Sequence, residues 1–135
     1  MVEITAEPIS PEVIINRVKG DKSGGVVTYV GLIRESSRDK KVASVEYCDI
    51  DGKAANRLEE IANETNQRWQ LNAIAICHRT GRLKVGDINL VVAIASVHRK
   101  EGFAACQHVI DRFKEKLPTD KRETYQDGSI WTEGK

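Results

Sequence analysis

Apolar residues that recur at every third or fourth position predict three helices in this chain. The stretch "PISPEVIINRVKG" (8–20) begins with Ser10, which can cap a helix, and with Pro11, which suits its first turn. A second helix is predicted over 53–69, and a third ends before Pro118. The predicted buried faces are, for the first helix, Ile14 and Val18; for the second, Ala54, Leu58, Ile61, Thr65 and Trp69; and for the third, Phe103, Cys106, Ile110, Phe113 and Leu117.

Four stretches rich in β-branched residues predict strands, and polar turn residues separate them. A polar, charged loop is expected at 35–41, and Asp127-Gly128 predicts a small hairpin near the C-terminus. Gly31 lies inside the first strand, where it marks a bulge or a close approach of the backbone. The predicted strands are 24–34, 42–50, 71–79 and 88–97.

The order of these elements predicts an α+β fold. Two strands follow each of the first two helices, and a third helix and the hairpin complete the chain. Short polar loops between successive strands favour antiparallel pairing over a doubly wound parallel sheet. With 135 residues the chain is expected to form one domain, 1–135, large enough to bury a core without disulfides.

Composition indicates an ordinary globular protein. Hydrophobic residues make up 40% and charged residues 30% of the chain, and the net charge is +1, which argues against a disordered tail or a general nucleic-acid binder. The acidic start "MVEITAEPIS" does not resemble a signal peptide, and no apolar run approaches the roughly 20 residues of a membrane span. Cys48, Cys77 and Cys106 are expected to be small buried residues in a reducing cytoplasm, so we expect a cytoplasmic protein.

Common nucleotide, metal and hydrolase motifs are absent. The chain has no G-x-G-x-x-G, Walker A loop, H-E-x-x-H or nucleophile elbow, and its dispersed His and Cys residues have no metal-ligand spacing. No metal and no cofactor are therefore expected.

The strongest chemical signal is the pair His98-Arg99, where the apolar stretch 88–97 ends and the third predicted helix begins. The first backbone N–H groups of a helix have no partner within the helix and favour an anion such as phosphate. Arginine adds a rigid two-pronged donor, and histidine adds a group that titrates near neutral pH. We expect this pair to bind an anion, whereas nothing selects Lys100.

Other cations lie beyond the other end of the same helix and at a strand end. Lys114 is placed at the edge of the buried surface, Lys121 and Arg122 lie in "PTDKRE", and Arg34 ends the first strand. Together with the His-Arg pair they favour a pocket for an anionic small molecule. Each also has a plainer interpretation, because lysines near a helix C-terminus and an arginine at a strand end are often solvated surface charges.

A second pair, His78-Arg79, ends another apolar stretch and is followed by Thr80-Gly81. No helix begins directly after it, so the anion argument does not apply. We expect a role beside a turn, with His78 hydrogen-bonded to the backbone.

Four segments in fixed order resemble the family of molybdopterin synthase catalytic (large) subunits: "GGVVTYVGLIRESS", "CHRTGRLKVGD", "ASVHRKEGFAACQHVIDRFKEKLP" and "KRE". The resemblance covers roughly residues 4–132. It implies an α/β hammerhead-type α+β fold with three main helices. It also implies a homodimer with a small ubiquitin-like subunit on each end, which makes a heterotetramer.

The reaction implied by the resemblance is sulfur insertion into cyclic pyranopterin monophosphate, which forms the dithiolene of molybdopterin. The sulfur arrives as a thiocarboxylate on the C-terminal Gly-Gly tail of the small subunit. Lys114 and Lys121 match the family's catalytic lysines, which can donate a proton or stabilise developing charge. Lys135 lies near a position where the family can present a basic residue across the dimer interface. The positions that match the substrate site are Leu32, Ile33, Arg34, His98, Arg99, Lys114, Lys121, Arg122 and Glu123.

Two departures from the family pattern leave an alternative open. Asp120 stands where the family usually has an aromatic residue, and a carboxylate there can draw the Lys121 ammonium aside. The stretch "YCDIDGK" (47–53) replaces an acidic-small-aromatic segment and alters a subunit-contact surface. The alternatives are a non-catalytic relative that binds a phosphorylated pterin or the small subunit as a regulatory module, and a generic anion-binding dimer.

Overall fold

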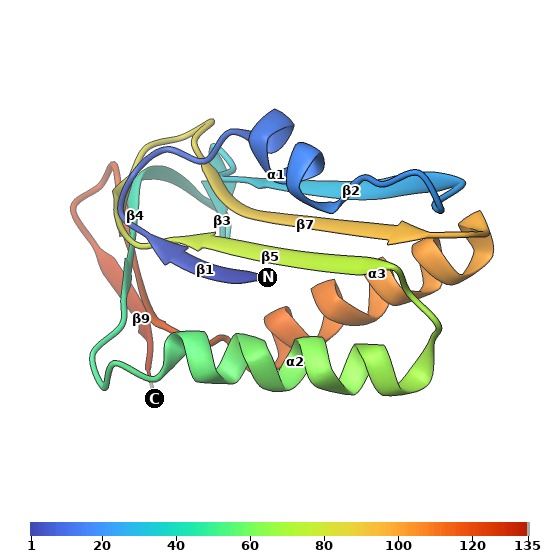
Figure 1. Ribbon diagram of the computed structural model, residues 1–135. Helices are drawn as coiled ribbons and strands as arrows, with labels where there is room; N and C mark the ends of the chain where they lie inside the picture. The colour runs from blue at the N-terminus through green and yellow to red at the C-terminus, as the bar shows by residue number, and fades with distance from the viewer. Residues whose placement is uncertain (135) are drawn as a thin grey trace.

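Two β-sheets and three helices form the part of the chain that the computed structural model describes, residues 1–134 (Figure 1). The first sheet consists of β1 (Val2–Thr5), β2 (Gly25–Leu32), β5 (Ala73–Arg79) and β7 (Ile88–Ser96). Its strand order is β1-β5-β7-β2, in which β1 is parallel to β5 and the other neighbours are antiparallel.

Helices cover both faces of this sheet. The helix α1 (Pro11–Val18) lies on one face, and α2 (Ala54–Arg68) and α3 (Arg99–Glu115) lie side by side on the other, as Figure 1 shows. Cys77 and Val91 pack in the core cluster of α1, whereas their chain neighbours Ile76 and Val92 pack in the cluster of α2 and α3. Because β7 is buried on both faces from Leu90 onward, residues 90–95 are a continuous apolar run rather than an alternating one.

The second sheet stands across one end of the first (Figure 1). Its order is β3-β4-β8-β9, and β6 pairs with β4. The β8–β9 hairpin turns through Gly128, whose φ of 88° lies in the left-handed region that glycine adopts readily. The strands are β3 (Ser36–Ser37), β4 (Lys40–Cys48), β6 (Gly81–Leu83), β8 (Asp120–Tyr125) and β9 (Ile130–Glu133).

The helices and long strands lie where the periodicity predicts them, and the α+β class is confirmed. In α1, Ser10 is the N-cap and its hydroxyl accepts a hydrogen bond from the backbone N–H of Val13. The predicted loop 35–41 instead contains β3 and a tight turn into β4. The short strands β1 and β6 were not predicted, because a few residues carry too little periodicity to reveal a strand.

The expected pairing between 24–34 and 42–50 is wrong. The corresponding strands, β2 and β4, belong to different sheets, where β2 pairs with β7 and β4 pairs with β8. Alternation of apolar and polar residues indicates which residues form a strand, but it does not say which strand lies beside it.

Two burial predictions also need correction. Phe103 is 62% exposed, because α3 turns Gly102 rather than Phe103 toward the sheet. A Cβ on Gly102 would lie 2.8 Å from Ser96 Oγ, so the helix approaches the sheet at its glycine. Cys48 is exposed, whereas Cys77 and Cys106 are buried as expected. Within residues 1–134, every helix is too short or too polar to cross a bilayer.

Candidate active site

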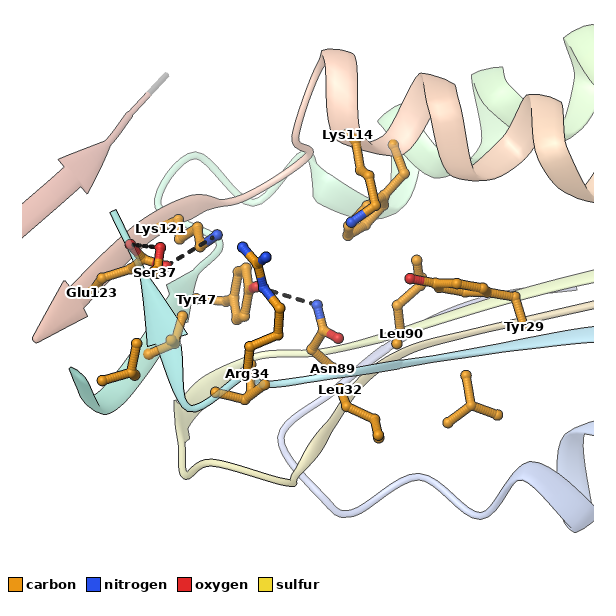
Figure 2. A pocket seen from close by; sticks show the side chains of 16 residues that line it. Tyr29, Leu32, Arg34, Ser37, Tyr47, Asn89, Leu90, Lys114, Lys121 and Glu123 are labelled. Carbon is orange, nitrogen blue, oxygen red and sulfur yellow. Dashed lines mark hydrogen bonds and ion pairs between the residues drawn. The ribbon is translucent and has the colours of Figure 1, made fainter. Parts of the chain in front are cut away.

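A cavity of about 490 Å³ lies where the two sheets and the C-terminal end of α3 meet. The end of β2, the start of β7, strands β4 and β8, and α3 all contribute to its wall, and Figure 2 shows this arrangement. The lining residues are Tyr29, Val30, Gly31, Leu32, Ile33, Arg34, Ser37, Val42, Val45, Tyr47, Asn89, Leu90, Phe113, Lys114, Lys121 and Glu123.

The end of β2 is shaped by Gly31. The register between β2 and β7 shifts between Gly31 and Leu32, as a bulge does. A Cβ on Gly31 would lie 2.9 Å from Asn89 Oδ1 and 3.1 Å from the Tyr29 ring, so both features expected of this glycine are confirmed. Ile33 is held by backbone hydrogen bonds with Asp87 and Gly86, and the adjacent Arg34 reaches into the cavity.

Three cationic side chains from separate elements converge on this cavity. Arg34 follows β2, Lys114 belongs to the last turn of α3, and Lys121 belongs to β8. In Figure 2, Arg34 and Lys121 point toward one another, and Lys114 reaches down from the helix. Among residues 1–134, Glu123 is the one carboxylate in the wall, so these side chains give the cavity an excess of positive charge that suits an anionic ligand.

Glu123 anchors the β8 side of the site. Its carboxylate accepts hydrogen bonds from Ser37 Oγ at 2.8 Å and Tyr125 Oη at 2.7 Å, and it lies 3.5 Å from Lys121 Nζ. Burial by itself would raise the pKa of Glu123, but these hydrogen bonds and the nearby lysine lower it overall. The side chain is therefore an ionised partner for Lys121 at neutral pH.

Two uncharged polar side chains, Tyr47 and Asn89, line the cavity beside these charged groups, and Tyr47 is opposite Lys121 in the register of β4 with β8. Asn89 Nδ2 donates a hydrogen bond to Tyr47 Oη at 3.2 Å. Burial raises the pKa of Tyr47 to about 12, so its phenol stays protonated and can donate a hydrogen bond to a ligand. Neither residue is among the predicted site residues, although a polar Asn89 between the apolar Ile88 and Leu90 is a signal in the sequence that could have indicated it.

His78 lies behind the cavity wall and is fully buried. Its Nδ1 is 2.8 Å from the backbone oxygen of Asn89, so the expected backbone hydrogen bond is present. Its Nε2 is 3.0 Å from Thr119 Oγ1. This contact joins residues 41 positions apart, so no local pattern in the sequence predicts it.

Most of the predicted site residues lie together, but three do not. Arg122 is exposed on the opposite face of β8 from its neighbours Lys121 and Glu123, because side chains alternate along a strand. His98 and Arg99 are exposed at the other end of α3, about 22 Å along the helix from Lys114. Those that line the cavity are Leu32, Ile33, Arg34, Lys114, Lys121 and Glu123. Lys135 lies outside the described residues.

Asp120 does not line the cavity. It is opposite Cys48 in the register of β8 with β4, and its side chain contributes to shallow pockets on the other face of the second sheet. Lys121 Nζ makes its ion pair with Glu123 instead.

Known proteins are similar to this chain in both sequence and architecture. Residues 4–116 match the family model described as MoaE protein. The molybdopterin synthase catalytic subunit of Bacillus subtilis is 35% identical over 96% of this chain and 82% of its own length. The crystal structure of molybdopterin synthase from Staphylococcus aureus matches with a TM-score of 0.89 and 32% identity, over 98% of this chain and 96% of that chain.

A more distant structure shows the same fold. It is a complex of subunits 1 and 2 of the molybdopterin-converting factor from Helicobacter pylori, which matches with a TM-score of 0.75 at 12% identity, over 93% of this chain and 86% of that chain. The family model matches most of the chain, sequence identity and fold agree over nearly all of it, and the chain belongs to the MoaE protein family.

Proposed function

We propose that this chain is the catalytic subunit of a molybdopterin synthase. It transfers sulfur from the thiocarboxylated C-terminus of a small ubiquitin-like subunit to cyclic pyranopterin monophosphate and so forms the dithiolene of molybdopterin. The observation that carries this proposal is the convergence of Arg34, Lys114 and Lys121 on one cavity in a chain of the MoaE family.

The charge of the cavity fits a phosphorylated substrate. The Arg34 guanidinium can bind two phosphate oxygens at once, and a lysine ammonium adds a compact charge. Tyr47 and Asn89 offer uncharged polar groups in the same cavity, with which the heterocycle of the substrate can form hydrogen bonds.

The two lysines supply the chemistry of sulfur transfer. When the thiocarboxylate sulfur attacks a carbon of the pterin, a C–S bond forms, and an ammonium group close by stabilises the developing negative charge or protonates the oxygen that leaves this carbon as water. Hydrolysis of the resulting thioester then breaks the bond between sulfur and the acyl group, which leaves the sulfur on the pterin and releases the small subunit as a carboxylate. Lys121 is held by the Glu123 carboxylate, whereas Lys114 extends from the last turn of a helix beside the buried Phe113.

A second copy of the chain supplies His98 and Arg99 in this proposal. Gly25 at the start of β2 pairs with Ser96 at the end of β7, so His98 lies near the start of β2 and the cavity lies at its end. Within the described residues β2 is an edge strand, with exposed apolar side chains at Val30 and Leu32. Antiparallel pairing of two β2 strands about a twofold axis would bring each His98-Arg99 pair to the cavity of the other copy.

The small subunit is the second proposed partner. The Helicobacter pylori complex contains two subunits of the molybdopterin-converting factor, and one of its chains has the fold of this protein. We infer that a homodimer binds one small subunit at each end, with the Gly-Gly tail entering the cavity. Ile50, in the divergent stretch 47–53, is 71% exposed and is available for such a contact. The free cysteines agree with a cytoplasmic location.

The non-catalytic alternative loses its main support in the structure. This alternative depends on Asp120 drawing the Lys121 ammonium aside. Asp120 does not line the cavity, and the ion pair of Lys121 is with Glu123. Membership in the MoaE family disfavours an unrelated anion-binding dimer.

Conversion of cyclic pyranopterin monophosphate by the purified complex, with thiocarboxylated small subunit, tests the proposed function. The wild-type complex should form molybdopterin, and Lys114→Ala and Lys121→Ala should each lose most of this activity. A folded complex that binds the small subunit but forms no product would contradict the proposal and favour the regulatory module.

A further inference from the structure

His78 connects three parts of the cavity wall although it does not itself line the cavity. Its ring lies edge-on between the rings of Tyr47 and Phe113, with centroid distances of 4.9 Å and 5.0 Å. Both ring nitrogens have partners, which are the Asn89 backbone oxygen and Thr119 Oγ1. One buried imidazole thus contacts β4, β7, α3 and the segment that enters β8.

These contacts determine which nitrogen carries the proton. A backbone carbonyl can only accept a hydrogen bond, so Nδ1 of His78 is protonated and donates to Asn89. Burial lowers the pKa of His78 to about 4, so the ring is neutral at physiological pH. Its Nε2 is therefore an acceptor, and the Thr119 hydroxyl donates to it.

The hydrogen bonds continue from His78 to the cavity. Thr119 donates to His78, His78 donates to the Asn89 backbone, and the Asn89 side chain donates to Tyr47 Oη at 3.2 Å. This series joins the segment before β8 to the phenol in the wall.

Both lysines of the site are close in sequence to residues that His78 contacts. Thr119 stands two residues before Lys121, and Phe113 immediately precedes Lys114. The helix α3 ends at Glu115 and β8 begins at Asp120, so the segment between them sets the separation of the two lysines. The contact between His78 and Thr119 fixes this segment against the first sheet.

We propose that His78 is a positioning residue of the sulfur-transfer site, which holds Lys114, Lys121 and Tyr47 in the relative arrangement that the reaction requires. This inference rests on the function proposed above. An apolar ring at position 78 would still pack between Tyr47 and Phe113, but it would leave the Asn89 carbonyl and the Thr119 hydroxyl without their partner. Polar contacts, rather than volume, therefore distinguish this role from ordinary core packing.

Variants at both ends of the Thr119–His78 hydrogen bond test the proposal in the complete complex with the small subunit. Thr119→Val keeps the shape but removes the donor, and His78→Phe keeps the ring but removes the acceptor. Each should lower kcat about 10- to 100-fold, because a small misplacement of catalytic groups has an effect of that size. KM for the pterin should change less than kcat, Thr119→Ser should stay near wild type, and Thr119→Val should add nothing to His78→Phe.

Val91→Ala is the matched control, because Val91 is fully buried in the same sheet but packs in the cluster of α1. It should lower Tm without changing kcat. If His78→Phe and Thr119→Val keep wild-type kcat, the positioning role is refuted. It is also refuted if Thr119→Ser lowers kcat as much as Thr119→Val does. An inactive wild-type complex would instead overturn the proposed function and this inference with it.

Discussion

Lys121 Nζ lies 3.5 Å from Glu123 Oε2, and the two side chains share the face of β8 that closes the cavity. Ser37 and Tyr125 fix the carboxylate from the other side through hydrogen bonds of 2.8 Å and 2.7 Å. Glu123 therefore acts as a rigid anchor for a flexible lysine, and it keeps that lysine at the wall rather than in solvent.

The Glu123→Gln variant tests this anchor. Its amide group cannot balance the lysine charge. The amide oxygen can still accept from the two hydroxyls that donate to Oε1, so the amide nitrogen, a donor, would replace the Oε2 that faces the Lys121 ammonium. We expect kcat to fall by about tenfold or more and the free energy of unfolding to fall by about 1–3 kcal/mol. Product formation and urea unfolding measure the two effects. Glu3→Gln, which breaks the exposed ion pair with Arg17, should change neither by a comparable amount, and equal losses in both variants would argue against a special role for Glu123.

The buried His78 predicts how stability depends on pH. Its pKa falls from an ordinary 6.5 to about 4 in the folded protein, so between these values the unfolded chain binds a proton that the folded chain does not. Stability is therefore lost as the pH falls from 6.5 toward 4, by about 3 kcal/mol in total for this group.

Chemical denaturation at several pH values measures this loss. His78→Phe should flatten the dependence between pH 4 and 6.5, whereas Val91→Ala, which removes packing but no titratable group, should lower stability without changing this dependence. A dependence that is equally steep in His78→Phe would show that another group is responsible.

Gly31→Ala should alter the site more than the stability of the fold. The new Cβ would meet Asn89 Oδ1 at 2.9 Å, and this atom is the movable end of a side chain that can shift within the cavity. We expect the pterin KM to rise several-fold, on the order of 1 kcal/mol of lost binding, with a small change in Tm. Gly20→Ala is the matched control, since nothing lies within 4 Å of a Cβ there. An unchanged KM would indicate that Asn89 does not contact the substrate.

Mixing two inactive variants tests whether His98 and Arg99 act in the cavity of a second copy. Arg34→Ala disables the cavity of its own chain, and Arg99→Ala disables that of the partner. A mixed dimer then contains one intact site, so equal amounts of the two variants should regain about a quarter of wild-type activity after subunit exchange.

The control for this experiment mixes Arg34→Ala with Lys114→Ala. Both residues line the cavity of the same chain, so every mixed dimer has two damaged sites and should stay inactive. Recovery in neither mixture would contradict the arrangement in which one copy completes the site of the other.

The sequence by itself determined the three helices and the long strands, because these depend on local spacing, and its four ordered motifs were enough to show the resemblance to the family. It also identified Arg34, Lys114, Lys121 and Glu123, which lie at element ends or in the "KRE" motif. Arg122 belongs to the same motif, yet strand alternation turns it away from the cavity, and only the assignment of β8 as a strand reveals this.

Tertiary structure alone decided how these elements come together. Local patterns cannot specify that β2 and β4 join different sheets, and this separation creates the corner in which the cavity lies. His78 illustrates the same limit: its position in the sequence suggested a turn, but residues 11 and 41 positions away complete its hydrogen bonds. Contacts between residues so distant in sequence form only when the chain folds, since they depend on packing between layers and not on the propensity of any single segment.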